Sequence, residues 1–311
     1  MADEKPPARI SHRLFATGRS EKRINISMAE IKKRLEEIKS EGTVYRALAL
    51  DLDGTLMDSQ KKLSEENKHA VWQAIEAGTA VILASGRPMF GVMPVAEQLE
   101  LDRRGGYVLA YNGGNIWDCR AKKMAYERQI PAECIEAVCA AARKNNAAPL
   151  TYFGDEVISE KADDEYVLKE AFCNGAEVMQ VDNIPGFVNY PVAKLLVVGE
   201  HLKLVPVKEE LENQYGRELE LFFSEDYFLE IVPKNVGKDV SLAALLEKLG
   251  IEQKELIACG DGLNDVSMIS YAGLGVAMAN AYQEVKDKAD YVTVSNDENG
   301  VARVIKDFIL N

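Results

Sequence analysis

The chain has 311 residues, of which 47% are hydrophobic and 28% are charged, and its 37 basic and 50 acidic side chains give a net charge of −13. The length predicts about two domains, and the composition is typical of a globular protein, which excludes collagen, a coiled coil, a disulfide scaffold and a wholly disordered chain. No apolar run approaches the roughly 18 residues of a membrane span, and the acidic charge argues against non-specific nucleic-acid binding, which depends on lysine and arginine.

The first predicted segment is an arm, residues 1–44, that ends in a short helix. Residues 1–27 are polar and show no sustained periodicity, whereas Ser27–Lys39 carries three aliphatic side chains at helical spacing. This helix either packs on its own protein or binds a protein partner through residues 1–44. The N-terminus lacks the apolar region of a signal peptide and the five cysteines form no Cys-x-x-Cys pair, so we expect reduced thiols and a cytoplasmic location.

Residues 45–128 show buried strands that alternate with helices. Ala47–Leu50, Ala80–Ala84 and Tyr107–Tyr111 are continuous apolar runs, which indicate strands covered on both faces. A helix that begins after Ser64 separates the first two runs, and a helical stretch separates the second and third. This alternation predicts βαβ units and a parallel sheet with right-handed crossovers.

The pattern changes after Ile130-Pro131. Helices near residues 133–144 and 204–215 are interspersed with short alternating segments, which is an α+β pattern. Residues 129–232 also contain 8 basic and 20 acidic side chains, so this block holds −12 of the net charge. We interpret the block as an inserted domain, and its acidity either reflects a solvated surface or disfavours polyanionic substrates.

The strand and helix alternation returns in residues 233–311, with a helix near Asp239–Leu249 and strands at Leu256–Cys259, Gly275–Met278 and Tyr291–Val294. The predicted fold is therefore α/β, with a doubly wound parallel sheet built from residues 45–128 and 233–311. Residues 129–232 form an α+β cap inserted into this core.

Acidic residues follow two of the predicted core strands. Asp51 and Asp53 come directly after the first strand, and Asp261 and Asp265 follow a later one. Ligands of such sheets bind at the carboxyl ends of the strands, so these side chains are expected to converge. Converging carboxylates repel unless a cation holds them, and Mg²⁺ prefers such oxygen ligands. A carboxylate can also act as a nucleophile towards phosphorus.

These residues lie in a set of motifs. Asp51-Leu52-Asp53-Gly54-Thr55-Leu56 resembles motif I of the haloacid dehalogenase superfamily of phosphohydrolases. Ser85 resembles its motif II, Lys238 its motif III and Gly260–Asp265 its motif IV, in the same order along the chain. Three further segments are similar to the Cof-like branch, which carries an α+β cap: Ala84–Pro88, Asn112–Gly114 and Ala279–Ala281. The resemblance covers residues 45–311.

The resemblance implies a role for each motif residue. Asp51 is expected to be the nucleophile and a Mg²⁺ ligand, and Asp53 the general acid/base whose backbone carbonyl also reaches the metal. Asp261 and Asp265 complete the metal site. Lys238 is expected to hold the phosphate and assist catalysis, with Lys234 as a competitor for this role. The remaining residues expected to bind phosphate or line its pocket are Ser85, Gly86, Arg87, Asn112 and Asn264.

Two of these assignments stay open on the sequence alone. Arg87 either contacts the phosphate or forms a structural ion pair at its turn, and Asn112 either lines the pocket or caps a turn. Gly54 and Thr55 are expected to shape the turn after the first strand.

The resemblance implies Mg²⁺-dependent hydrolysis of a small phosphomonoester, with sugar phosphates as the leading substrate class, through an aspartyl-phosphate. The expected partner is thus a small phosphorylated metabolite, rather than nucleic acid or a membrane. Two alternatives remain: a phosphomutase or phosphotransferase that uses the same site, and a non-catalytic protein that binds a phospho-ligand.

Overall fold

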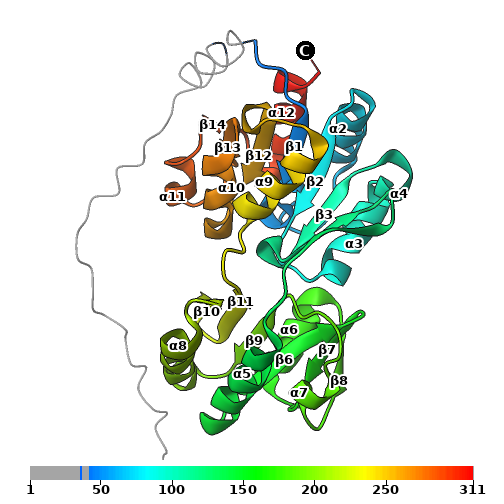
Figure 1. The fold of residues 1–311 in the computed structure, drawn as a ribbon. Helices are drawn as coiled ribbons and strands as arrows, with labels where there is room; N and C mark the ends of the chain where they lie inside the picture. The colour runs from blue at the N-terminus through cyan, green and yellow to red at the C-terminus, as the bar shows by residue number, and fades with distance from the viewer. Residues whose placement is uncertain (1–35, 37–41, 311) are drawn as a thin grey trace, which may run out of the picture.

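The computed structural model of the protein describes Glu36 and residues 42–310. The predicted helix Ser27–Lys39 therefore lies outside the described residues except for Glu36. The described residues form two bodies, each built around one sheet (Figure 1). We call the body with eight strands the core and the body with six strands the cap.

The core sheet confirms the predicted α/β architecture. Its strand order is β14 (Tyr291–Val292), β13 (Leu274–Ala277), β12 (Leu256–Gly260), β1 (Ala47–Leu50), β2 (Ala80–Ala84), β3 (Tyr107–Ala110), β4 (Asn115–Asp118) and β5 (Lys123–Glu127). All pairs from β14 to β3 are parallel. The four residues of β1 are fully buried at the centre of the sheet, as expected for a continuous apolar run.

Helices cover both faces of the core sheet, which explains why its strands are apolar throughout. One face packs against α2 (Glu65–Glu76), α3 (Met89–Gln98), α4 (Leu101–Arg104) and α12 (Gly300–Phe308). The other face packs against α9 (Lys238–Leu249), α10 (Val266–Tyr271) and α11 (Gln283–Lys286). The predicted helix after Ser64 is α2, whose first turn is capped by the Ser64 hydroxyl, which accepts a hydrogen bond from Asn67 N at 3.1 Å.

The sheet departs from the predicted parallel arrangement at one edge, where β4 and β5 run antiparallel. Only the turn Tyr111–Gly114 separates β3 from β4. A parallel partner needs a crossover of roughly a dozen residues, so this short turn permits only a hairpin.

The cap sheet is mostly antiparallel, with the order β10 (Leu219–Glu225), β11 (Phe228–Pro233), β9 (Leu195–Val198), β6 (Ala148–Phe153), β7 (Glu156–Ser159) and β8 (Glu177–Gln180). Helices α5 (Ala132–Lys144), α7 (Ile184–Phe187) and α8 (His201–Tyr215) cover one face. Helix α6 (Glu165–Asn174) packs on the other face, together with Tyr111 of the core.

All six cap strands lie between β5 and α9 along the chain, and the two bodies stand one above the other in Figure 1. The domain boundaries themselves, 45–128, 129–232 and 233–311, stay predictions. Among the described residues, no helix combines the length and the apolar character that crossing a membrane requires. Short helical turns complete the fold at Leu52–Leu56, Tyr111–Gly113, Gln253–Glu255, Leu263–Asp265 and Asn296–Glu298.

Candidate active site

The carboxyl ends of three neighbouring core strands bring polar residues together. Asp51 follows β1, Ser85 follows β2 and Asp261 follows β12. Because β1 pairs in parallel with both other strands, their carboxyl ends meet at the same edge of the sheet. The backbone N–H of Asp51 continues the ladder by donating to the Cys259 carbonyl at 3.0 Å, so the side chain leaves the sheet at a fixed position.

Three carboxylates converge at this edge. One oxygen from each of Asp51, Asp261 and Asp265 lies within 4.8 Å of the others. Asp51 and Asp265 are buried, whereas Asp261 is partly exposed towards the cavity above. Such a set of hard oxygen donors suits a divalent cation such as Mg²⁺. The carboxylate of Asp53 is not part of this cluster.

Lys238 at the start of α9 contacts two of the three carboxylates. Its buried ammonium donates to Asp51 Oδ1 at 2.8 Å, to Asp265 Oδ1 at 2.6 Å and to the Ala84 carbonyl at 2.8 Å. All three of its donors are thus used. Lys234 instead pairs with Glu220 at 2.7 Å. The structure therefore places Lys238, and not Lys234, among the carboxylates.

Burial and mutual repulsion shift the protonation of this cluster. Burial, reinforced by the charge of Asp265, raises the pKa of Asp51 to about 8 against the opposing effect of Lys238. The same two causes raise the pKa of Asp261 to about 6. Burial opposes the charge of Lys238, but Asp265 and Asp51 outweigh it and raise the lysine pKa above its usual value. Three carboxylates against one lysine leave excess negative charge, which a bound cation would neutralise.

The turn after β1 orients Asp261. Gly54 has φ +77°, and a Cβ at this position would overlap the Asp261 carboxylate, so only glycine permits this close approach. The Thr55 hydroxyl donates to Asp261 Oδ1 at 3.1 Å. Asn280 Nδ2 donates to the Gly54 carbonyl at 2.8 Å and to Asp261 Oδ2 at 3.4 Å. Turn and carboxylate therefore hold each other in place.

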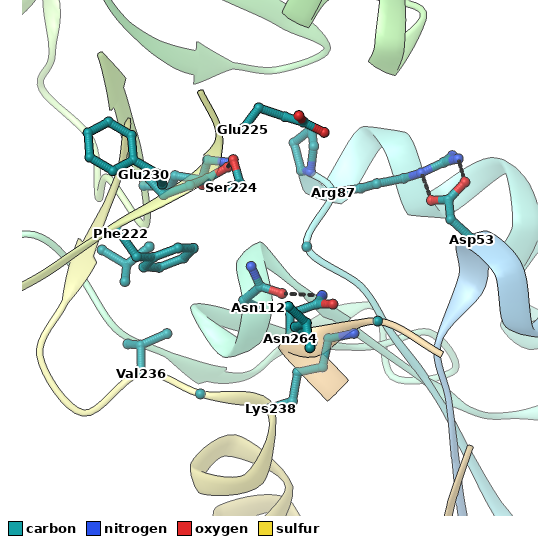
Figure 2. Close-up of a pocket in the computed structure, with 18 of the residues that line it drawn as sticks. Asp53, Arg87, Asn112, Phe222, Ser224, Glu225, Glu230, Val236, Lys238 and Asn264 are labelled. Carbon is teal, nitrogen blue, oxygen red and sulfur yellow. Dashed lines mark hydrogen bonds and ion pairs between the residues drawn. The ribbon is translucent and has the colours of Figure 1, made fainter. Parts of the chain in front are cut away.

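Asp53 lies outside the cluster and forms a bidentate ion pair with Arg87, which Figure 2 shows. Arg87 Nε donates to Asp53 Oδ2 at 2.7 Å and Nη2 donates to Oδ1 at 2.6 Å. Arg87 is further held by Nη1, which donates to the Gly91 carbonyl at 3.2 Å. Of the two sequence hypotheses for Arg87, the structure shows the ion pair, and the contact with phosphate stays a prediction. The metal contact predicted for the Asp53 backbone carbonyl stays a prediction.

The other predicted residues line two adjoining cavities above the carboxylates. Asn264 Nδ2 donates to Asn112 Oδ1 at 3.1 Å across the mouth of the site (Figure 2). The backbone N–H of Arg87 donates to the Ser85 hydroxyl at 3.2 Å. The smaller cavity, about 260 Å³, is lined by Asp51, Asp53, Ser85, Gly86, Arg87, Asp261, Gly262, Asn264 and Asp265.

A larger cavity of about 970 Å³ lies between core and cap, and its cap side contains residues that the sequence did not single out. Lys194 and Glu230 form a buried ion pair at 2.5 Å, and the Ser224 hydroxyl donates to Glu230 Oε1 at 2.9 Å. A signal was present in the sequence, because Lys194 directly precedes the apolar strand β9 and Glu230 interrupts the apolar strand β11. A charged residue within such a run is unusual unless it has a partner.

Comparison with known proteins agrees with this geometry. Residues 48–305 match the sequence profile of the haloacid dehalogenase-like hydrolases. A haloacid dehalogenase-like hydrolase from Bacteroides thetaiotaomicron has a similar crystal structure, with 44% identity and a TM-score of 0.80 over 84% of this chain and 98% of that chain.

Two relatives from Bacillus subtilis carry the name 5-amino-6-(5-phospho-D-ribitylamino)uracil phosphatase. YwtE is 32% identical over 284 residues, which are 84% of this chain and 96% of YwtE. YcsE is 30% identical over 277 residues, which are 88% of this chain and 99% of YcsE. The protein therefore belongs to the haloacid dehalogenase-like hydrolases and is a phosphatase of that family that acts on small phosphate substrates.

Proposed function

We propose that the protein hydrolyses a small phosphomonoester with Mg²⁺ through an aspartyl-phosphate formed on Asp51. The observation that carries this proposal is the position of Asp51. It lies at the carboxyl end of the central strand, within 4.8 Å of two further carboxylates and 2.8 Å from the ammonium of Lys238. A carboxylate in this setting is oriented for attack, with a fixed positive charge beside it.

The donor set fits the proposed cation. Asp51, Asp261 and Asp265 supply oxygen ligands from three side chains, and the backbone carbonyl of Asp53 is the proposed fourth contribution. When bound, Mg²⁺ supplies positive charge that stabilises the phosphoryl oxygens. Lys238 orients Asp51 and Asp265 through its two carboxylate contacts and keeps Asp51 from turning away.

Two displacements complete the reaction. In the first, an Asp51 carboxylate oxygen forms a bond to phosphorus while the bond from phosphorus to the ester oxygen breaks. Asp53, which must first leave its ion pair with Arg87 and bind a proton, gives this proton to the leaving oxygen. In the second, Asp53 takes a proton from water, the water oxygen bonds to phosphorus and the Asp51–phosphorus bond breaks. Phosphate leaves and both aspartates return to their starting states.

A phosphorylated sugar or sugar alcohol is the proposed substrate class, and the expected partner is accordingly a small phosphorylated metabolite. Two relatives are named for a substrate that contains a phosphorylated ribityl chain, which supports this class. The cavity between core and cap is of a size that holds a small organic ligand. A protein contact through residues 1–44 stays a prediction, because most of these residues lie outside the described part of the chain.

Hydrolysis of p-nitrophenyl phosphate tests the proposal directly. We expect turnover with Mg²⁺ and its loss in EDTA, and D51N should reduce kcat by at least about 10³-fold, because the nucleophile is removed. D155N is the matched control, because Asp155 is an exposed turn residue of the cap, and it should retain normal turnover. Full activity in D51N would refute the aspartyl-phosphate mechanism, and release of more nitrophenol than phosphate would favour phosphotransfer to another alcohol.

A further inference from the structure

We propose that the cap side of the large cavity makes the enzyme selective for monophosphates whose remaining part is neutral or cationic, and that it rejects substrates with a second anionic group. This inference rests on the proposed function and deepens it by assigning the substrate's charge class. It follows from how charged side chains are distributed between the two halves of the cavity.

The two halves of the cavity differ in charge. The core half contains Lys61, Arg87 and Lys238, together with Asp53. The cap half contains four glutamates and one lysine: Glu170, Glu220, Glu225, Glu230 and Lys194. Figure 2 shows Ser224, Glu225 and Glu230 across the cavity from Asn112, Asn264 and Lys238. A substrate phosphate at the core end would therefore leave the rest of the molecule beside carboxylates.

Two of the cap glutamates are already neutralised. Glu230 is paired with Lys194 at 2.5 Å, and both side chains are buried. Glu220 is paired with Lys234 at 2.7 Å. The single lysine of the cap wall is therefore committed to Glu230, and it offers no free positive charge to a second anion.

The other two glutamates have no ion pair in the part of the chain that the structure describes. Glu170 is buried and accepts only neutral donors, the Tyr152 hydroxyl at 2.7 Å and Asn174 Nδ2 at 2.9 Å, both on Oε1. Glu225 is exposed at the end of β10. Each carboxylate has lone pairs left to accept hydrogen bonds from hydroxyl or ammonium groups. The Lys169 ammonium lies near enough to Glu225 for their charges to interact, but the two form no ion pair. A phosphate or carboxylate on the substrate would therefore meet charge of the same sign that is at most partly compensated.

Apolar side chains line part of the remaining cavity wall. Phe222 and Val232 lie on its cap side, and Val236 lies on the segment that leads back to the core. Figure 2 shows Phe222 and Val236 on one side of the cavity. These groups lower the local polarity and give a second anion no hydrogen-bond donor. The cap side of the cavity therefore offers no favourable place for a second anionic group.

Three aryl phosphates of nearly the same shape test the inference. 4-Carboxyphenyl, 4-carbamoylphenyl and 4-amidinophenyl phosphate differ in the charge that faces the cap, which is negative, neutral and positive respectively. We expect kcat/KM of the wild type to be at least about fivefold lower for the carboxylate than for the carboxamide, with the amidine at or above the carboxamide. Added salt should narrow the difference, because Glu225 is exposed.

The variant E225K tests whether Glu225 causes the lower kcat/KM of the carboxylate ester. The ratio of kcat/KM between the carboxylate and the carboxamide ester should rise about tenfold in E225K and about threefold in E225Q. Because the same two esters are used for every variant, the difference in their intrinsic chemical reactivity does not affect the comparison of the ratios. E209K is the matched control, because Glu209 is an exposed residue on α8 of the same cap that does not line the cavity, and its ratio should equal that of the wild type.

The possible outcomes distinguish a failure of the charge-selectivity inference from a failure of the proposed phosphatase function. No turnover of the neutral carboxamide ester would overturn the proposed function and this inference with it. Turnover of all three esters with equal kcat/KM in the wild type would overturn the inference alone. An unchanged ratio in E225K, or an equal rise in E209K, would overturn the assignment to Glu225.

Discussion

At the scale of single residues, the burial of the Asp51 carboxylate lowers the stability of the metal-free protein. Burial raises its pKa to about 8, so without a cation the folded protein holds a proton there far more tightly than the unfolded chain does. Lys238 compensates only part of the charge, since it serves Asp265 as well. The residue that we propose to attack phosphorus is thus also one that destabilises the metal-free protein.

The sign of this effect gives a measurable pH dependence. Between the ordinary pKa near 3.8 and the raised value of about 8, the native state binds more protons at Asp51 than the unfolded state, so stability falls as pH rises through this window. In EDTA, D51N should therefore melt at a higher temperature than the wild type at pH 8, by about 2 °C or more. The difference should vanish near pH 4. Calorimetry at both pH values checks this, and a lower melting temperature of D51N at pH 8 would contradict it.

Lys238 gives a second prediction at this scale. K238M removes the ammonium that contacts Asp51 and Asp265, so kcat should fall by at least about 10²-fold. K234M is the matched control, because Lys234 pairs with Glu220 instead. Steady-state kinetics with p-nitrophenyl phosphate measures both variants, and near-normal turnover of K238M would return the role to Lys234.

Among the secondary-structure elements, those with a simple pattern were predictable from sequence. The strands β1, β2 and β12 are buried apolar runs, so their ends, and with them Asp51, Ser85 and Asp261, could be placed without a structure. The edge strands β4 and β5 were missed because they are partly exposed and mix polar with apolar residues. Their pairing depends on the tight turn after β3, which periodicity alone does not reveal.

The turn between β1 and the carboxylate cluster gives a prediction at the scale of an element. G54A should weaken Mg²⁺ binding and lower kcat/KM by at least about tenfold, because the new Cβ displaces Asp261. G154A is the matched control, since Gly154 also has a positive φ but open space around it. Both variants should lose roughly 1 kcal/mol of stability from backbone strain. Calorimetric titration with Mg²⁺ separates them, and equal affinities would refute the displacement.

At the scale of the whole molecule, the sequence located one half of the site and not the other. The predicted residues are all on the core, where recurring motifs and strand ends mark them. The cap residues Lys194, Glu170 and Glu225 come from β-strand borders and a helix that only the folded cap brings to one cavity. Local patterns carry no information on such contacts, so the sequence yielded only the cap's overall acidity.

The chain passes between core and cap twice, and both passages meet at one place. Arg128 N donates to the Gly114 carbonyl at 2.8 Å on the first passage, and on the second the Gly237 carbonyl lies so close to Gly113 that a Cβ there would overlap it. No strand of the core sheet lies between these two passages along the chain, because β1–β5 precede the cap and β12–β14 follow it. A different cap could therefore be grafted between the same two points without rethreading a strand, provided that the chain returns directly before Lys238. If the cap sets the specificity as we propose, replacing this one inserted segment would change the substrate without altering the residues of the core site.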